Sequence, residues 1–267
     1  MAILTLSREF GSGGREIGWA VTESLGYEYV DKEKIHDEIR AAGRDWDEWG
    51  KELDEHCPTI WEKYDWSFRG YGALVQSAIL NYALKDRVVI MGRGGNLLLR
   101  GIPHAVRIRV AASLETRIER IMVRDSVDRE TARWLAEKTD RGRSRFLYSL
   151  YGKQWDDPAE FDFVFTTDVK SLDEIIRFVK DLLLERDRLN TPESRSILQM
   201  RAAAATVKAG LLTNPSLFVP TLDVLDDGTA IVLRGVVHNP KEHKRIEEAA
   251  RKLAGDLPLK CELHYRG

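Results

Sequence analysis

The chain has 267 residues, of which 43% are hydrophobic and 31% charged, and its 41 basic and 43 acidic residues leave a net charge of -2. This composition predicts a globular protein of one or two domains with a sizeable core, and it excludes a collagen, an overall disordered chain and a disulfide-dense mini-protein. The near-zero charge gives no bulk attraction to nucleic acid or to an anionic membrane.

The chain contains no targeting or membrane-spanning pattern. Its N-terminus lacks the basic start and apolar run of a signal peptide, and it has no apolar stretch of about 18 residues that could span a membrane. We therefore expect a cytoplasmic location. Cys57 and Cys261 lie far apart and match no metal-ligand or disulfide spacing, so we interpret both as structural thiols and expect no metal-binding residues.

The first segments follow the order strand, glycine-rich loop, helix, strand. Residues 2–6 are apolar and predict a buried strand. Apolar positions at helical spacing predict a helix over residues 17–25 that ends at Gly26, and residues 27–30 predict a second strand. Such a unit predicts a parallel sheet covered by helices.

Residues 32–85 have a mostly helical pattern and contain Trp46, Trp49, Trp61 and Trp66. We interpret them as a helical insertion, whose tryptophans either pack inside it or form a partly exposed aromatic surface.

Strands and helices alternate in the next part of the chain. The pattern predicts strands over residues 87–91, 105–110 and 163–166, and helices over residues 113–125, over residues 128–138 and from Ser171. Ser171 and Glu174 form a Ser-x-x-Glu capping box. Arg117 and Arg124 recur among acidic residues, and we interpret them as part of a solvated, ion-paired helix face.

The composition turns polar around Pro192, and we place a domain boundary there, between a domain over residues 1–188 and one over residues 195–267. In the second domain the pattern predicts helices over residues 196–212 and 240–254 and strands over residues 222–225, 230–237 and 259–264. Asp-Asp-Gly at 226–228 predicts a hairpin. We expect an α+β module with an antiparallel sheet and helices on one face.

The loop after the first strand has the residues of a phosphate cradle. Glycines allow the backbone to approach a ligand closely, and the N–H groups of the following helix point at the same spot. Ser12 adds a hydroxyl donor and Arg15 a positive charge. The predicted phosphate-contacting residues are Gly11, Ser12, Gly13, Gly14, Arg15 and Glu16. The strict P-loop pattern G-x-x-x-x-G-K-[ST] is not satisfied, since no lysine follows the glycines, and a tight structural turn is the alternative.

Several ordered motifs resemble those of bacterial cytidylate kinases, in particular a divergent cytidylate kinase-like branch. They are SREFGSGGREI within residues 4–31, the Gly-Arg element at 92–93, AASLETRIER at 111–120 and the arginine-rich segment at 140–145. The resemblance covers roughly residues 1–185.

This resemblance implies a P-loop α/β fold, with a parallel sheet flanked by helices, a helical insertion and a lid. It implies a nucleoside monophosphate kinase that uses ATP and Mg²⁺ and phosphorylates CMP or dCMP. Phosphoryl transfer depends mainly on positioning and on charge stabilisation, which arginine supplies bidentately. The residues implied for catalysis are Arg15, Arg141, Arg143 and Arg145, and those implied for the acceptor nucleotide are Asp31, Gly92, Arg93 and Lys138.

The chain departs from this family's pattern at several positions. The family's loop lysine falls on Gly14, the residue after it on Arg15 and the first loop glycine on Arg8, while two aspartates fall on Gly94 and Gly142. A second hypothesis is therefore a catalytically weak nucleotide sensor, and a third is a scaffold that binds no nucleotide.

The last part of the chain, roughly residues 196–267, resembles a BON domain through DGTAIVLRGVVHNPKEHKRIEEAARKLAG and the final strand. The resemblance implies a regulatory module that binds a small ligand, a lipid or a protein. The histidines show no catalytic pairing in the sequence, and we interpret them, including His238 and His243, as structural or surface residues.

Overall fold

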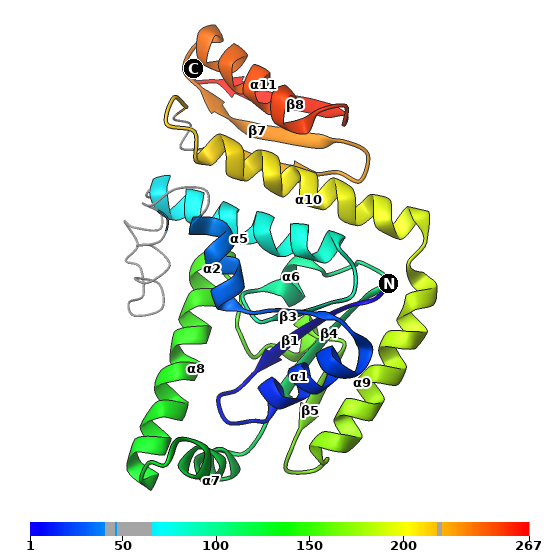
Figure 1. The fold of residues 1–267 in the computed structure, drawn as a ribbon. Helices are drawn as coiled ribbons and strands as arrows, with labels where there is room; N and C mark the ends of the chain where they lie inside the picture. The colour runs from blue at the N-terminus through cyan, green and yellow to red at the C-terminus, as the bar shows by residue number, and fades with distance from the viewer. Residues whose placement is uncertain (41–45, 47–65, 218–220, 267) are drawn as a thin grey trace.

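The computed structural model describes residues 1–40, 46, 66–217 and 221–266 (Figure 1). Its main sheet has five parallel strands in the order β2-β3-β1-β4-β5. These strands are β1 (Ile3–Arg8), β2 (Glu28–Val30), β3 (Val88–Met91), β4 (Ala105–Ala111) and β5 (Phe163–Thr166). The predicted α/β fold is confirmed, and the carboxyl ends of all five strands share one edge of the sheet.

Helices cover both faces of this sheet (Figure 1). Along the central strand β1, Leu4 and Leu6 face a hydrophobic cluster formed with α1 (Gly14–Leu25) and α9 (Leu172–Arg186). Ile3 faces the opposite cluster, which includes α5 (Trp66–Leu84). A strand buried on both faces is typical of a parallel sheet between two helical layers.

The other helices of this part are α2 (Lys32–Arg40), α6 (Gly95–Leu98), α7 (Leu114–Asp125) and α8 (Arg129–Tyr151), with short 3-10 turns η1 (Pro158–Glu160) and η2 (Asp187–Leu189). Ser113 caps α7, and the predicted Ser171–Glu174 capping box begins α9.

The helix predicted over residues 128–138 is longer than expected. It continues through the arginine-rich segment and ends at Gly152, whose left-handed φ of 64° stops it. Gly142 does not end the helix, because a single glycine inside a helix costs only about 1 kcal/mol. The arginines that the resemblance implies for a lid therefore lie on a helix.

In the insertion between β2 and β3, Trp46 packs against the core beside α5, and a Cβ on Gly70 would lie 2.6 Å from its ring. Trp66 also packs against buried clusters. The packing interpretation is confirmed for these two, while Trp49 and Trp61 lie outside the described residues.

The C-terminal module consists of α10 (Pro192–Leu212), β6 (Asp223–Asp226), β7 (Ile231–Val237), α11 (Pro240–Ala254) and β8 (Leu259–Tyr265). The expectation of an antiparallel sheet is wrong in part: β6 and β7 are antiparallel, but β7 and β8 are parallel. The hairpin turn reverses the chain between β6 and β7, whereas α11 carries the chain back before β8, and a helical crossover joins parallel strands.

Helix α10 lies between the two parts of the molecule (Figure 1). Leu198 and Ala202 belong to the core beside α5, while Val207 and Leu211 pack under the C-terminal sheet. A polar contact of 3.1 Å joins Ser77 Oγ of α5 to Thr206 Oγ1 of α10. The division of the chain into residues 1–188 and 195–267 stays a prediction.

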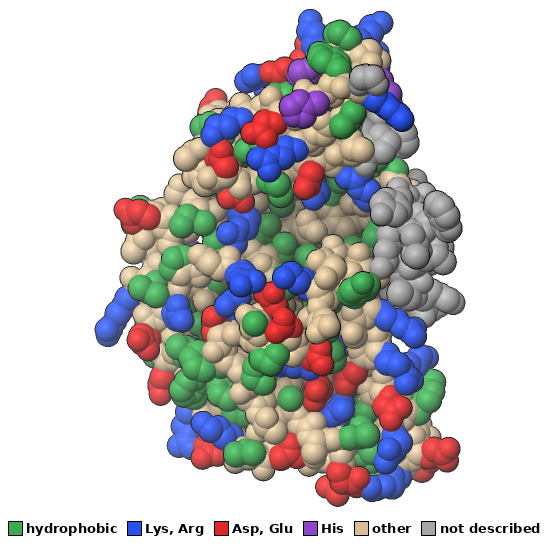
Figure 2. Space-filling view, turned by 180° about the vertical axis from the view of Figure 1, so that it is seen from behind, with side chains coloured by type: hydrophobic (Ala, Val, Ile, Leu, Met, Phe, Trp, Pro, Cys, Tyr) green, Lys and Arg blue, Asp and Glu red, His purple; other side chains and the backbone are tan. Residues whose placement is uncertain are grey.

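Acidic and basic side chains are interspersed over the face shown in Figure 2, in keeping with the small net charge. In the described part of the chain, no helix is long and apolar enough to cross a bilayer.

Candidate functional site

The predicted phosphate loop connects β1 to α1 at the carboxyl edge of the main sheet. Gly11 and Gly13 have φ values of 81° and 86°, in the left-handed region. A Cβ on Gly13 would lie 2.6 Å from Leu172 Cδ2 of α9, so a larger residue would displace the loop or the helix. Glycine is therefore required by conformation and by packing.

Arginines from α7 and α8 hold the loop's carbonyl groups. Arg143 Nη1 donates to the carbonyl of Arg8 at 2.6 Å, and Arg117 Nη1 donates to the carbonyl of Phe10 at 3.3 Å. Asp140 connects these contacts, since it accepts from the Phe10 N–H at 2.9 Å and from Arg117 at 2.5 Å. Burial raises the pKa of the Asp140 carboxyl, whereas the adjacent arginines act to lower this pKa.

The other end of the loop is held in the same way. The Ser12 carbonyl accepts from Arg120 Nη1 at 3.2 Å and from Thr167 Oγ1 at 2.9 Å. The Ser12 hydroxyl, fully buried, donates to the Glu9 carbonyl at 2.9 Å. This orientation makes Ser12 a loop-bracing residue here, while its predicted contact with a ligand stays a prediction.

With the carbonyls held, backbone N–H groups are left to face a ligand. Among the described residues, no protein acceptor takes a hydrogen bond from the N–H of Gly11, Gly13 or Gly14. These amides lie at the N-terminus of a 12-residue helix, where the helix dipole favours a negative charge. The loop therefore has the geometry of an anion cradle.

The prediction for Arg117 is wrong, because its side chain is only 11% exposed and contacts the loop and Asp140. Arg124 does lie on the surface in an ion pair of 2.7 Å with Asp125, as predicted. The two residues are seven apart and share one face of α7. Arg117, however, lies beneath the phosphate loop. Helical periodicity shows which residues share a face of a helix, but it does not show which part of that face is covered by another segment of the chain.

The turn after β3 lies beside this loop, because β3 is the neighbour of β1. Gly92, Arg93 and Gly94 all have positive φ, of 78°, 54° and 82°. A non-glycine residue is uncommon in this region and is often held there at functional sites. The Arg93 guanidinium lies 4.2 Å from the centre of the Phe146 ring, which fixes it at this edge.

Positive charge is concentrated between the two turns. Arg8 Nη1 lies 2.7 Å from where a Cβ on Gly92 would stand. Burial chiefly lowers the pKa of Arg8, with Arg93 contributing, and burial followed by the charge of Arg8 lowers the pKa of Arg143 to about 9. An anion among these three guanidinium groups would relieve their mutual repulsion.

The structure leaves no room for a side chain at Gly94, the position at which the resemblance implies an aspartate. The Tyr151 ring occupies the space that a Gly94 side chain would need, and the Tyr151 hydroxyl donates to the Arg93 carbonyl at 2.9 Å. The end of α8 therefore supports the Arg93 turn directly.

The other predicted site residues are spread over this edge. Asp31 follows β2, and its carboxylate accepts from the Lys34 N–H at 3.1 Å. Arg15 and Glu16 are exposed in the first turn of α1. Lys138, Arg141 and Arg145 are exposed on α8.

Of the four predicted catalytic arginines, the three on α8 do not converge on the loop. Arg143 contacts it, whereas Arg141 pairs with Glu137 at 3.7 Å and Arg145 is exposed. Residues two apart in a helix face in nearly opposite directions. Five residues of the site were not predicted from the sequence, namely Arg8, Asp140, Arg117, Arg120 and Thr167, although all of them except Thr167 stand inside the motifs quoted above.

A central parallel strand that runs into a glycine-rich loop and a helix N-terminus defines the class of α/β phosphate-binding proteins. Within it, the chain belongs to the cytidylate kinase-like family, whose model matches residues 3–169. This places the first part of the chain among nucleotide-binding phosphotransferases of the kinase type.

Individual relatives agree with this assignment. The chain is 30% identical over 184 residues to a cytidylate kinase of Pyrobaculum aerophilum, covering 68% of this chain and 92% of that protein. It is 31% identical over 105 residues to a cytidylate kinase of Thermoplasma acidophilum, covering 39% of this chain and 55% of that protein. An uncharacterized protein from Eubacterium ventriosum has a similar fold, with a TM-score of 0.53 and 20% identity over 68% of this chain and 98% of that one.

Proposed function

We propose that this protein is an ATP-dependent nucleoside monophosphate kinase whose acceptor is CMP or dCMP. The observation that carries the proposal is the cradle of amides at Gly11, Gly13 and Gly14, which donate to no described residue, beside the guanidinium groups of Arg8 and Arg93. Two adjoining anion sites are what transfer between two nucleotides needs.

In this proposal Mg-ATP is the donor substrate and its phosphates lie on the loop amides. A phosphate oxygen of the acceptor forms a bond to the γ-phosphorus, the bond from that phosphorus to the β–γ bridging oxygen breaks, and ADP leaves with that oxygen. Arg143 and Arg15 would supply the positive charge that a loop lysine supplies elsewhere. Glu16 is the nearby exposed carboxylate available to the metal ion that enters with ATP.

The acceptor side rests on Arg8, Arg93 and Asp31. The two arginines would hold the acceptor phosphate, and the Asp31 carboxylate, which lies within electrostatic reach of Arg8, would accept from an exocyclic amino group. Cytosine carries such a donor at N4 and uracil does not. This chemistry, and the names of the relatives, favour CMP or dCMP over UMP. Gly92 contributes the close backbone approach, and the roles of Lys138, Arg141 and Arg145 stay predictions.

The test is an ADP-release assay with Mg-ATP and, in turn, CMP, dCMP, UMP and AMP. We expect turnover with CMP or dCMP and at least tenfold lower kcat/KM with UMP. Absence of turnover with all four acceptors, in protein shown to be folded, would overturn the proposal.

A second candidate function is a nucleotide sensor that acts through the C-terminal module. Gly14 at the position of the loop lysine favours it, because losing one transition-state donor typically lowers the rate about 10²- to 10³-fold. Helix α10, which packs against both parts, would carry the signal. Calorimetry that finds nucleotide binding without turnover would support this function, and turnover of about 1 s⁻¹ or more would exclude it.

The C-terminal ligand of this second candidate is also a proposal. A cleft of about 460 Å³ lies at the N-terminal end of α11, with Lys241 and Arg245 among its lining residues. It is separate from the phosphate loop and would suit an anionic group of a small ligand, a lipid or a protein.

A further inference from the structure

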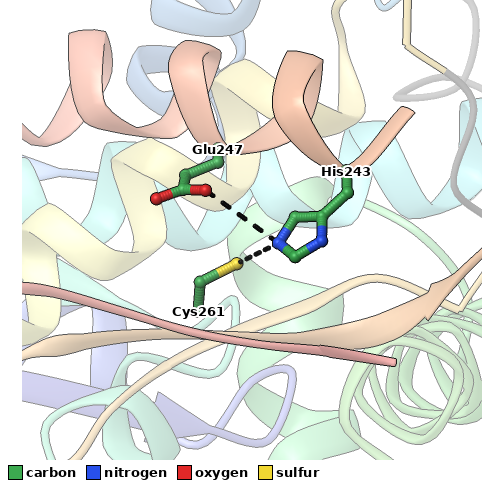
Figure 3. Close-up of side chains that lie close together, drawn as sticks. All are labelled: His243, Glu247 and Cys261. Atoms are coloured by element: carbon green, nitrogen blue, oxygen red, sulfur yellow. Dashed lines mark hydrogen bonds and ion pairs between the residues drawn. The ribbon is translucent and has the colours of Figure 1, made fainter. Parts of the chain in front are cut away.

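Three side chains with metal-binding atoms meet in the C-terminal module, away from the phosphate loop (Figure 3). His243 and Glu247 are four residues apart and so lie on one face of α11. Cys261 comes from β8, on which α11 packs. All three are half-buried, so that solvent and ions have access to them.

The same nitrogen of His243 faces both other groups. His243 Nε2 lies 3.3 Å from Cys261 Sγ and 3.9 Å from Glu247 Oε2, and the three ligand atoms lie within 4.8 Å of one another. Tetrahedral Zn²⁺, with bonds of about 2.0–2.3 Å, separates its ligand atoms by about 3.5 Å. Small side-chain movements would therefore bring all three atoms to bonding distance.

Outer contacts orient two of these ligands. His243 Nδ1 lies 3.0 Å from the Tyr265 hydroxyl, and the tautomer that donates there leaves the Nε2 lone pair toward Cys261. Arg251 donates to Glu247 Oε1 at 2.8 Å, which leaves Oε2 on the side of His243. Outer-shell hydrogen bonds of this kind are typical of metal-binding histidines and carboxylates.

The arrangement does not match a nucleophilic triad. In a triad the acid contacts the ring nitrogen opposite the one that faces the nucleophile, whereas here the thiol and the carboxylate both face Nε2. Nitrogen, oxygen and sulfur atoms that point to one centre are instead typical of ligands that bind the same metal cation.

We propose that His243, Glu247 and Cys261 bind one divalent cation of the zinc class, with a fourth position open to water. On binding, the Cys261 thiol gives its proton to the solvent and the thiolate bonds to the metal. This site is independent of the proposed kinase activity.

The test is titration of the chelator-stripped full chain with Zn²⁺, and separately with Co²⁺, in a Cys57→Ser background in which Cys261 is the sole thiol. We expect one equivalent of Zn²⁺ and a thiolate-to-cobalt charge-transfer band. Cys261→Ser should abolish the band, and His243→Gln should weaken binding at least tenfold, as loss of a ligand requires.

His238→Ala is the matched control. His238 also faces an acidic residue four positions on, Glu242 at 3.2 Å, but within the described residues no cysteine contacts it, so its variant should keep the stoichiometry and the band. The proposal is overturned if the parent protein binds no Zn²⁺ at equimolar concentration, or if Zn²⁺ binding is unchanged in both His243→Gln and Cys261→Ser. Circular dichroism of each variant establishes that it is folded.

Discussion

At the scale of single residues, the phosphate loop is supported from behind, through its carbonyl oxygens. Arg143, Arg117 and Arg120 each donate to a different loop carbonyl, while the N–H groups of Gly11, Gly13 and Gly14 have no acceptor among the described residues. Planar guanidinium groups that reach backbone carbonyls fix a loop more firmly than a flexible ammonium would. The shape of the cradle is thus set by residues more than 100 positions away in the sequence.

Replacement of Gly13 by alanine should damage the cradle through a contact as well as through its φ. The new Cβ would meet Leu172, and a positive φ costs an alanine roughly 1–2 kcal/mol. Gly101→Ala is the matched control, because Gly101 has a φ of 77° and open space around it. We expect a larger loss of stability in urea unfolding for Gly13→Ala than for Gly101→Ala, because only the former adds a steric contact, and at least a tenfold higher Kd for ATP in Gly13→Ala alone. Equal ATP affinities in the two variants would contradict this account.

At the scale of elements, α8 joins the loop, the Arg93 turn and the surface. Its inner face carries Asp140, Arg143 and Tyr151, while Arg141 and Arg145 are exposed. An arginine on the inner face and one on the outer face of α8 can therefore be replaced in turn, which compares the roles of two identical side chains on one helix.

Arg143→Ala should lower kcat/KM about 10²- to 10³-fold, because it removes a guanidinium that both holds the loop and contributes charge. Arg141→Ala, which removes an exposed ion pair of 3.7 Å, should lower it less than tenfold. Steady-state kinetics of both variants decide the point. A larger loss for Arg141→Ala would indicate that the outer arginines close over the substrate, as the family resemblance implies.

Local patterns in the sequence predict some of these elements and miss others. The strands, the glycine loop and the Ser171 cap follow from local patterns, and all were predictable. Residues 140–145 form a loop or a helix depending on where the preceding helix ends. A single glycine, Gly142, does not determine that position. The contacts of Arg120 with Ser12 and Thr167 join three distant segments, and no local pattern encodes them. The parallel β7–β8 pairing could have been predicted from the intervening helix.

At the scale of the whole molecule, α10 connects the two cores. Leu198 and Leu211 are both fully buried on this helix, the first beside α5 and the second under the C-terminal sheet. A helix shared by two cores should make them unfold together.

We therefore expect one cooperative unfolding transition, which both Leu198→Ala and Leu211→Ala shift by about 2–5 kcal/mol. Calorimetry of the parent chain and the two variants measures this. Two transitions, each moved by one substitution, would show instead that the cores unfold independently.

The stability of the molecule should also depend on pH through His104. This residue is fully buried, its ring nitrogens have no partner among the described residues, and burial lowers its pKa. Folding therefore favours the neutral ring. The contribution of neutral His104 to the free energy of unfolding is complete above the unfolded-state pKa of about 6.5. It is lost as the pH falls through the lowered pKa of the folded state.

Urea unfolding at a series of pH values below about 7 checks this expectation. His104→Leu should flatten the decline of the unfolding free energy, whereas His264→Leu, at an exposed position, should leave it unchanged. An unaltered pH slope in His104→Leu would contradict the assignment.

The central claim, that the phosphate loop and the Arg93 turn bind two nucleotides for phosphoryl transfer, is tested most directly by product analysis. Mg-ATP and CMP are incubated with the full chain, and the nucleotides are separated by chromatography. The account predicts CDP and ADP in equal amounts, with little product in Arg143→Ala. ADP formed without CDP, or no product from folded protein with either CMP or dCMP, would contradict it.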